Sequence, residues 1–214
     1  MPDIFDEVDE DLRADRARKL LQQYGGMIVA AALAVVVGAG AWQGWRWYDA
    51  RETDRVAAIY IAALRQADGP QPQEALAPLQ KVIAEGNSGY RTLARLRAAA
   101  LKAQAGDRDG ALALYDQVTG DGAADPLLRD LSSLQWATLQ IDHGDPAAIE
   151  ARLARLLAPD HPFRALASEA QALLALRQGR TEVARETFKR LAQDVTAPDG
   201  VRGRANGLLA QLGG

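Results

Sequence analysis

The side chains that most often carry catalysis or bind metals are sparse in this sequence of 214 residues. The absence of cysteine excludes disulfides, thiol catalysis and cysteine-ligated metals. The two histidines, His143 and His161, have no second histidine or carboxylate at a metal-ligand spacing such as H-E-x-x-H. Ser132 and Ser133 lie in a helical stripe and not in a G-x-S-x-G turn. We therefore predict a protein that is not an enzyme and that holds no metal or cofactor.

The remaining clusters of glycine and acidic residues favour structural roles. No strand is predicted before the glycines near the end of the sequence, so they do not form a phosphate-binding loop. The acids near predicted turns favour helix capping over calcium binding. A net charge of -3 argues against a nucleic-acid partner, because phosphate binding needs a basic face. The residues concerned are Gly200, Gly203, Gly207, Asp107, Asp109, Asp121 and Asp125.

One apolar stretch organises the chain. No charged side chain occurs from Leu20 to Trp45, and a bilayer core about 30 Å thick needs roughly 20 mostly apolar residues in a helix. Aromatic rings, which prefer the headgroup level of a membrane, gather at the far end of this stretch. We predict a single transmembrane helix with the membrane-interface residues Trp42, Trp45, Arg46, Trp47 and Tyr48.

This helix divides the chain into three predicted parts. They are a cytoplasmic tail over residues 1–24, a transmembrane helix over 25–48 and a periplasmic domain over 49–214. Arg18 and Lys19 suit the cytoplasmic flank, which predicts a single-pass protein of the bacterial inner membrane with its N-terminus inside. Because arginines also follow the span, charge alone fixes this orientation only weakly.

Several alternatives for this first part stay open. The small residues at 39–41 fit a signal-peptidase site, although the segment before the apolar stretch is long and acidic where a signal peptide is short and basic. A buried core helix of a soluble protein is a second alternative. Gly40 and Gly44 either bring two spans together or are simply common residue types in a span. Ile4, Phe5 and Val8 anchor a docking peptide or belong to a solvated helix start.

After Tyr48 the sequence predicts helix after helix and no strands, so the fold class is all-α. The first helix is expected to continue until Asp68-Gly69-Pro70. Asp125-Pro126 and Asp145-Pro146 each place a capping oxygen before a proline at the first helical position. We expect further helices to begin at Pro78 and, with Thr181 in a similar capping role, near residue 181. Short connections favour antiparallel helix pairs.

Three of these helix pairs share an internal repeat. Turn glycines occur at Gly106, Gly144 and Gly179, with spacings of 38 and 35 residues, close to the period of 34 of tetratricopeptide repeats. Ala111 and Ala184 occupy the position where paired helices cross, and Ile149 replaces them in the middle unit. Tyr115 and Phe188 follow four residues later, where an aromatic ring commonly packs. The sequence therefore predicts a tetratricopeptide-like α-solenoid of antiparallel helix pairs.

A solenoid of this kind leaves a concave groove for extended peptides or partner helices. The first helix of each pair is expected to line it, and the candidate residues are Tyr90, Arg91, Arg95, Arg129 and Trp136. The alternative is that the arginines lie on a solvated outer face and that Trp136 belongs to the core.

The whole chain resembles the YfgM-like ancillary subunit family of the SecYEG translocon. The resemblance rests on the charged tail, the border Gly44-Trp45-Arg46-Trp47-Tyr48, and the repeats over 90–118 and 163–194. It implies a single-pass inner-membrane protein with a periplasmic repeat domain. The implied partners are Sec translocon subunits and a membrane-anchored chaperone of the peptidyl-prolyl isomerase class. The implied role is the handling of secreted proteins as they emerge.

A second class of function is a scaffold or regulator that acts through its cytoplasmic tail on a soluble regulator. Residues 1–20 would then be the active part. Removing most of the tail distinguishes the two classes, because only the scaffold would lose its effect.

Overall fold

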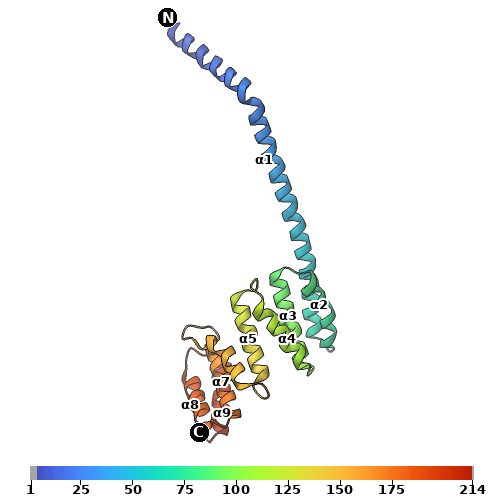
Figure 1. Ribbon diagram of the computed structural model, residues 1–214, viewed down its shortest axis with the longest axis vertical. Coiled ribbons are helices and arrows are strands. Elements are labelled where there is room, and N and C mark those ends of the chain that lie inside the picture. Colours follow the sequence, from blue (N-terminus) through green and yellow to red (C-terminus); the bar gives the residue numbers. More distant parts are fainter. Residues whose placement is uncertain (1–3, 214) are drawn as a thin grey trace. The chain divides into compact units, whose positions relative to one another are not determined.

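The computed structural model describes the backbone of residues 4–213 and the side chains of residues 24–27, 29–48 and 50–213. All regular structure in this described part is helical (Figure 1), which confirms the all-α prediction. The side chains of Ile4, Phe5 and Val8, and with them the predicted docking peptide, lie outside the described side chains. The α-helices are α1 (Ile4–Ala67), α2 (Leu76–Glu85), α3 (Ser88–Gln104), α4 (Arg108–Gly120), α5 (Pro126–Gln140), α6 (Pro146–Ala154), α7 (Arg164–Arg177), α8 (Thr181–Gln193) and α9 (Asp199–Gln211), and the short 3-10 segments are η1 (Pro72–Ala75) and η2 (Arg155–Leu157).

The chain divides into two compact units between Asp54 and Arg55. The first unit contains α1 up to residue 54, and its most apolar window is long and hydrophobic enough to cross a membrane, with no part of the window buried. This helix is therefore compatible with a single-pass membrane protein. The predicted domain boundary after residue 48 and the transmembrane assignment stay predictions.

The second unit is a succession of helix pairs. The last part of α1, from Arg55 to Ala67, pairs with α2, and α3 with α4, α5 with α6, and α7 with α8 follow along the chain (Figure 1). α9 packs on α8 and α7. The first helices of consecutive pairs also touch, because α5 contacts both α3 and α7. They therefore form a layer of their own.

Three hydrophobic clusters hold these pairs together. The first joins the end of α1 to α2, α3 and α4, the second joins α5, α6 and α7, and the third joins α7, α8 and α9. Trp136 packs against both the first and the second cluster, and Leu166 and Leu173 pack against both the second and the third. Each pair thus buries apolar surface on its neighbours, as in a solenoid.

The predicted crossing residues lie inside these clusters. Ala111 and Ala184 are fully buried, and so is Ile149 in the middle pair. Tyr115 and Phe188 are buried beside them, and burial raises the pKa of the Tyr115 hydroxyl above its ordinary value. The small residue at the crossing lets the two helices approach closely while the ring fills the space one turn later.

Two of the three turn glycines are required by backbone geometry. Gly106 has φ of 84° and Gly179 has φ of 75°, a region that residues with a Cβ adopt at a cost. At each of these turns the amide of the glycine and the amide of the next residue bond back into the preceding helix, as when Gly106 N–H donates to Ala103 O at 3.1 Å and Asp107 N–H to Lys102 O at 2.9 Å. This is the Schellman arrangement of a helix end. Gly144, which the sequence groups with them, does not have a positive φ.

Helix starts agree with the sequence in two places and differ in two others. Asp125 and Asp145 cap α5 and α6, each before a proline at the first helical position, as predicted. α2 begins at Leu76, two residues before the predicted start at Pro78. The prolines of a first turn cost no hydrogen bond because the first four N–H groups have no partner within the helix. Thr181 does not cap α8, because the capping position is Arg180 and no side chain bonds there.

Candidate functional site

The layer of first helices carries one repeated stripe of residues. On α5, α7 and α9 the positions i, i+3, i+4 and i+7 face a common cavity of about 560 Å³. Residues at this spacing share one face of a helix. The stripes are Leu131, Leu134, Gln135 and Thr138 on α5, Leu166, Glu169, Ala170 and Leu173 on α7, and Arg204, Gly207, Leu208 and Gln211 on α9, with Ile141 completing the lining. We call this cavity the α5–α7–α9 groove.

The groove has an apolar floor with one bidentate ion pair. Arg204 donates from Nε and Nη2 to the two carboxylate oxygens of Glu169, both at 2.6 Å. The Glu169 side chain is 9% exposed, and its hydrogen bond raises the pKa of the Arg204 guanidinium. A bidentate pair of this kind is the strongest form of the arginine–carboxylate contact. It ties α9 to α7 and engages both carboxylate oxygens of Glu169.

A second cavity of about 520 Å³ adjoins the first and shares Thr138, Ile141 and Leu173 with it. Its charged residues include Arg177, whose Nη1 donates to Ile141 O at 2.6 Å and whose Nη2 donates to Gly144 O at 2.8 Å. Arg177 therefore satisfies carbonyl groups at the end of α5 and in the turn that follows. Both of its terminal nitrogens are engaged within the protein.

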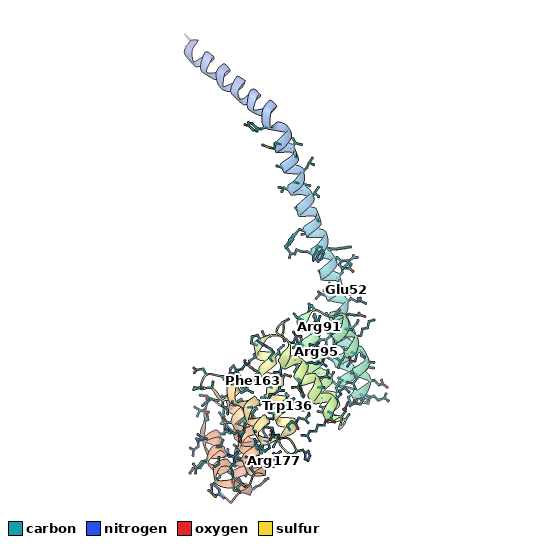
Figure 2. The ribbon with its side chains drawn as sticks, viewed as in Figure 1. Glu52, Arg91, Arg95, Trp136, Phe163 and Arg177 are labelled. Carbon is teal, nitrogen blue, oxygen red and sulfur yellow. The ribbon has the colours of Figure 1, made fainter. Side chains whose placement is uncertain are left out.

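The residues predicted to line a groove lie elsewhere. Figure 2 shows Arg91 and Arg95 near one another on α3 and apart from Arg177. Arg95 Nη1 donates to Asp121 Oδ2 at 2.9 Å, Arg91 Nη2 donates to Gly86 O at 3.1 Å, and the Tyr90 ring meets Tyr60 edge-on at 5.8 Å. These three side chains link neighbouring segments of the first core and do not line the α5–α7–α9 groove.

Trp136 and Arg129 are the other two predicted residues, and both are on α5. Trp136 packs against two hydrophobic clusters, with the Arg152 guanidinium 4.4 Å from the ring centroid. This is the core placement that the sequence left open for Trp136. Arg129 is half-buried, and its buried Nε has no hydrogen-bond partner among the described residues. Whether any of the five binds a partner stays a prediction.

The sequence shows most of the apolar groove residues only as apolar helical stripes, without indicating a groove. The stripes of Leu131, Leu134 and Thr138, and of Leu166, Ala170 and Leu173, carry the apolar periodicity of a buried helix face, and a groove floor has the same periodicity. The feature that distinguishes a groove floor from a core face is the recurrence of the same stripe at the repeat spacing. The α5 stripe recurs on α7 after 35 residues, the spacing between Gly144 and Gly179. Residues that both pack on the core and line the groove can be identified only once the positions of the three helices in the structure are known.

His161 and Ser132 have structural partners. His161 Nε2 lies 3.0 Å from Asp130 Oδ2, and the Phe163 N–H donates to His161 Nδ1 at 3.1 Å. Nε2 is therefore the nitrogen that donates to the carboxylate. The Ser132 hydroxyl donates to Tyr115 O at 2.8 Å. Among the side chains described, no group of three acidic or histidine residues is placed to hold a metal ion.

The predicted membrane-interface residues are all exposed on α1. Trp42, Trp45, Trp47 and Tyr48 each expose more than half of their surface, and the Arg51 guanidinium lies 3.7 Å from the centroid of the Trp47 ring. A cation over an aromatic face is favourable at a membrane boundary, where one side of the ring is apolar and the other is wet. The arrangement is compatible with the predicted membrane interface, which stays a prediction.

The family model of a tetratricopeptide repeat-like domain matches residues 18–205. This chain belongs to the tetratricopeptide repeat-like domain family. The match begins before the apolar stretch and ends within α9, so it covers the candidate membrane helix together with the helix pairs. No curated protein and no solved structure matches the chain. The repeat-like domain, as a class, indicates protein–protein interaction.

Proposed function

We propose that this protein is a membrane-anchored interaction protein of the bacterial cell envelope, acting as an ancillary subunit of the Sec translocon. In this proposal the domain after α1's apolar part is periplasmic, and it links the channel to a chaperone of the peptidyl-prolyl isomerase class and to secreted proteins as they emerge. The function is binding and not catalysis. Its specific partners come from the resemblance to the YfgM-like family.

One observation carries the proposal. A single match to a tetratricopeptide repeat-like domain extends from residue 18 to residue 205 and so joins an apolar helix to a layer of helix pairs. A repeat domain alone indicates a protein partner, and the apolar helix restricts the place where that partner is met. The exposed tryptophans at the end of the apolar stretch support a membrane boundary there.

The proposal that the function is binding and not catalysis is supported by the hydrogen-bond partners of the polar side chains. Asp130 bonds His161 and Arg155, and Ser132 bonds a main-chain carbonyl. Each of these groups has a partner that fixes helix packing, and none faces the α5–α7–α9 groove. The groove itself has an apolar floor, which suits recognition of a polypeptide.

The test is recovery of partners from membranes. The tagged full-length protein is solubilised in mild detergent, and the proteins that accompany it are identified by mass spectrometry. We expect channel subunits and a periplasmic isomerase in specific excess over a control in which residues 49–214 are exchanged for an unrelated domain. Absence of both from the wild-type sample would overturn the translocon assignment.

A tail deletion separates the proposal from the scaffold alternative. Removing residues 1–15 keeps Arg16, Arg18 and Lys19 next to the apolar stretch. The proposed translocon subunit retains its envelope partners after this deletion. Recovery of a cytoplasmic regulator by the wild type, and its loss after the deletion, would favour the scaffold instead.

A further inference from the structure

We propose that the α5–α7–α9 groove binds an extended, unfolded segment of polypeptide whose inward-facing side chains are apolar and uncharged. This inference rests on the proposed function as an envelope interaction protein and names the chemistry of what one site on it holds. Three features of the groove carry it: its floor, its charges and its neutral rim.

The floor selects apolar side chains. Leu131, Leu166, Leu173 and Leu208 come from three helices and line one cavity of about 560 Å³, and each of the four is partly exposed. Ligand sites are typically cavities of this size with a mostly apolar lining. Apolar side chains that enter it remove leucine surface from water, at a gain of about 25 cal/mol per Å².

The charges in the groove select against charged side chains. The two charged residues that line the groove, Glu169 and Arg204, form a bidentate pair with each other, and Arg177 of the adjoining cavity donates from both terminal nitrogens to main-chain carbonyls. An incoming charge would lose its water and would have to compete with these bonds, and burying an unpaired charge is costly. Charge complementarity therefore favours a neutral segment.

The rim offers neutral hydrogen-bonding groups. Gln135 on α5 and Gln211 on α9 are exposed lining residues, and no hydrogen bond joins either amide to another described residue. Each amide can donate and accept, which matches the N–H and C=O groups of a peptide backbone. An acyl chain would leave both amides unused, so the polypeptide is favoured over a lipid.

The size of the groove sets the length of the segment. Packed helices lie 8–10 Å apart, so three of them span roughly 16–20 Å. An extended chain advances about 3.3 Å per residue with alternate side chains on one side, so about five or six residues cross the groove and two or three point into it. Folded proteins rarely expose five or six extended residues with apolar side chains, whereas a polypeptide that has not yet folded does.

The test uses two glycines of α9 as a matched pair. At Gly207, which lines the groove, and at Gly203, which does not, an added Cβ meets no atom within 4 Å and φ is not positive. Gly207→Leu therefore fills the groove without straining the helix, and Gly203→Leu makes the same change of helix propensity outside it. Both variants should unfold at the same temperature as the wild type or higher.

The probe is a fluorescently labelled peptide of about seven residues in which leucine and serine alternate, measured by anisotropy on the full-length protein in detergent. We expect at least tenfold weaker binding to Gly207→Leu and unchanged binding to Gly203→Leu. A second probe with aspartate in place of each leucine should bind at least tenfold more weakly to the wild type. Equal binding of the two probes, or of the leucine probe to the two variants, would overturn the proposal.

Competing occupants give different results. Displacement of the peptide by free fatty acid at equal concentration assigns the groove to an acyl chain, and a concentration-dependent dimer in the wild type that Gly207→Leu abolishes assigns it to a second copy. Either result would replace the peptide. Failure of the partner recovery described above, with peptide binding intact, would overturn the translocon assignment and leave the groove's chemistry standing.

Discussion

The outer helix pairs of the repeat-like domain, α3–α4 and α7–α8, and its middle pair, α5–α6, are held together by different contacts. In α3–α4 and α7–α8 the turn glycine, the crossing alanine, the aromatic ring and an aspartate at the end of the second helix recur 73 residues apart. The aspartates are Asp121 and Asp194, and each accepts a bond from an arginine of its partner helix, Arg95 or Arg164. Each outer pair thus has an arginine–aspartate bond that joins its first helix to the end of its second.

The middle pair, α5–α6, lacks these local devices. Its turn glycine is not left-handed, its crossing residue is isoleucine, and the end of α6 carries Arg155 where the outer pairs carry aspartate. The charges are reversed, since Arg155 donates to Asp130 on α5. Arg177 on α7 bonds the end of α5 from the next pair. The comparison indicates that the left-handed glycine, the crossing alanine and the terminal aspartate of the repeat can be lost where a neighbouring helix pair supplies other bonds.

The largest expected effect comes from exchanging the crossing residues. Ile149→Ala removes a fully buried side chain and leaves a cavity, so we expect a loss of about 2–5 kcal/mol in the opening free energy of α5–α6. Ala184→Ile overpacks the α7–α8 crossing and should cost about 1–3 kcal/mol there. Hydrogen exchange measured by mass spectrometry on the full-length protein resolves each pair separately. A stabilised α7–α8 in Ala184→Ile would contradict the role of a small residue at the outer crossings.

The second effect concerns the bonds that the middle pair receives from α7. Arg177→Met removes two charge-assisted bonds to main-chain carbonyls while keeping much of the apolar stem, and we expect roughly 1.5–3 kcal/mol less protection at the end of α5. Arg180→Met is the control, because its pair with Glu150 is exposed and such pairs contribute about 0–1 kcal/mol. Equal effects of the two substitutions would show that the middle pair does not depend on its neighbour.

Local signals were sufficient for the architecture of the helix pairs. Asp125 and Asp145 before proline, and glycine at 106 and 179, fix helix ends through bonds within a few residues, so their sequence spacing contains the information. The all-α prediction and the tetratricopeptide-like repeat followed from them. Pro78 misled because a proline is tolerated anywhere in the first turn of a helix and so locates its start only approximately.

The groove and the long-range bonds were not predictable in the same way. His161 and Asp130 are 31 residues apart in the sequence, and Arg177 and Ile141 are 36 apart, so no local spacing predicts either contact. The leucine stripes of α5 and α7 have one periodicity for two roles, core and groove floor. The arginines of α3 were expected to line a concave groove because they lie on the first helix of a pair, and Arg95 forms an ion pair with Asp121; whether they also bind a partner stays a prediction.

A smaller effect is expected at the turn glycines. Gly179→Ala forces a residue with a Cβ into the left-handed region, and we expect a loss of about 1–2 kcal/mol at the junction of α7 and α8. Gly120→Ala, at the last residue of α4, has no positive φ and no atom within 4 Å of the new Cβ, so it should be neutral or slightly stabilising. If Gly179→Ala were as benign as Gly120→Ala, the outer turns would not be the local devices described above.

The smallest effect is a dependence on acid that distinguishes the outer pairs. Bonds from the hydroxyl and amide of Thr196 lower the pKa of Asp194, and the bond from the Ala123 amide lowers that of Asp121, with the neighbouring arginines adding to both. A carboxyl whose pKa falls on folding stabilises the folded state above its unfolded value of about 3.9, and this contribution is lost as the pH falls through the lower folded value. Protection of α4 and α8 should therefore decline below about pH 4 in the wild type and decline less in Asp121→Asn and Asp194→Asn, respectively. Because α6 ends in an arginine, these substitutions should leave the acid response of the middle pair unchanged. An equal change in all three pairs would mean that acid acts on the whole domain and not on Asp121 and Asp194 in particular.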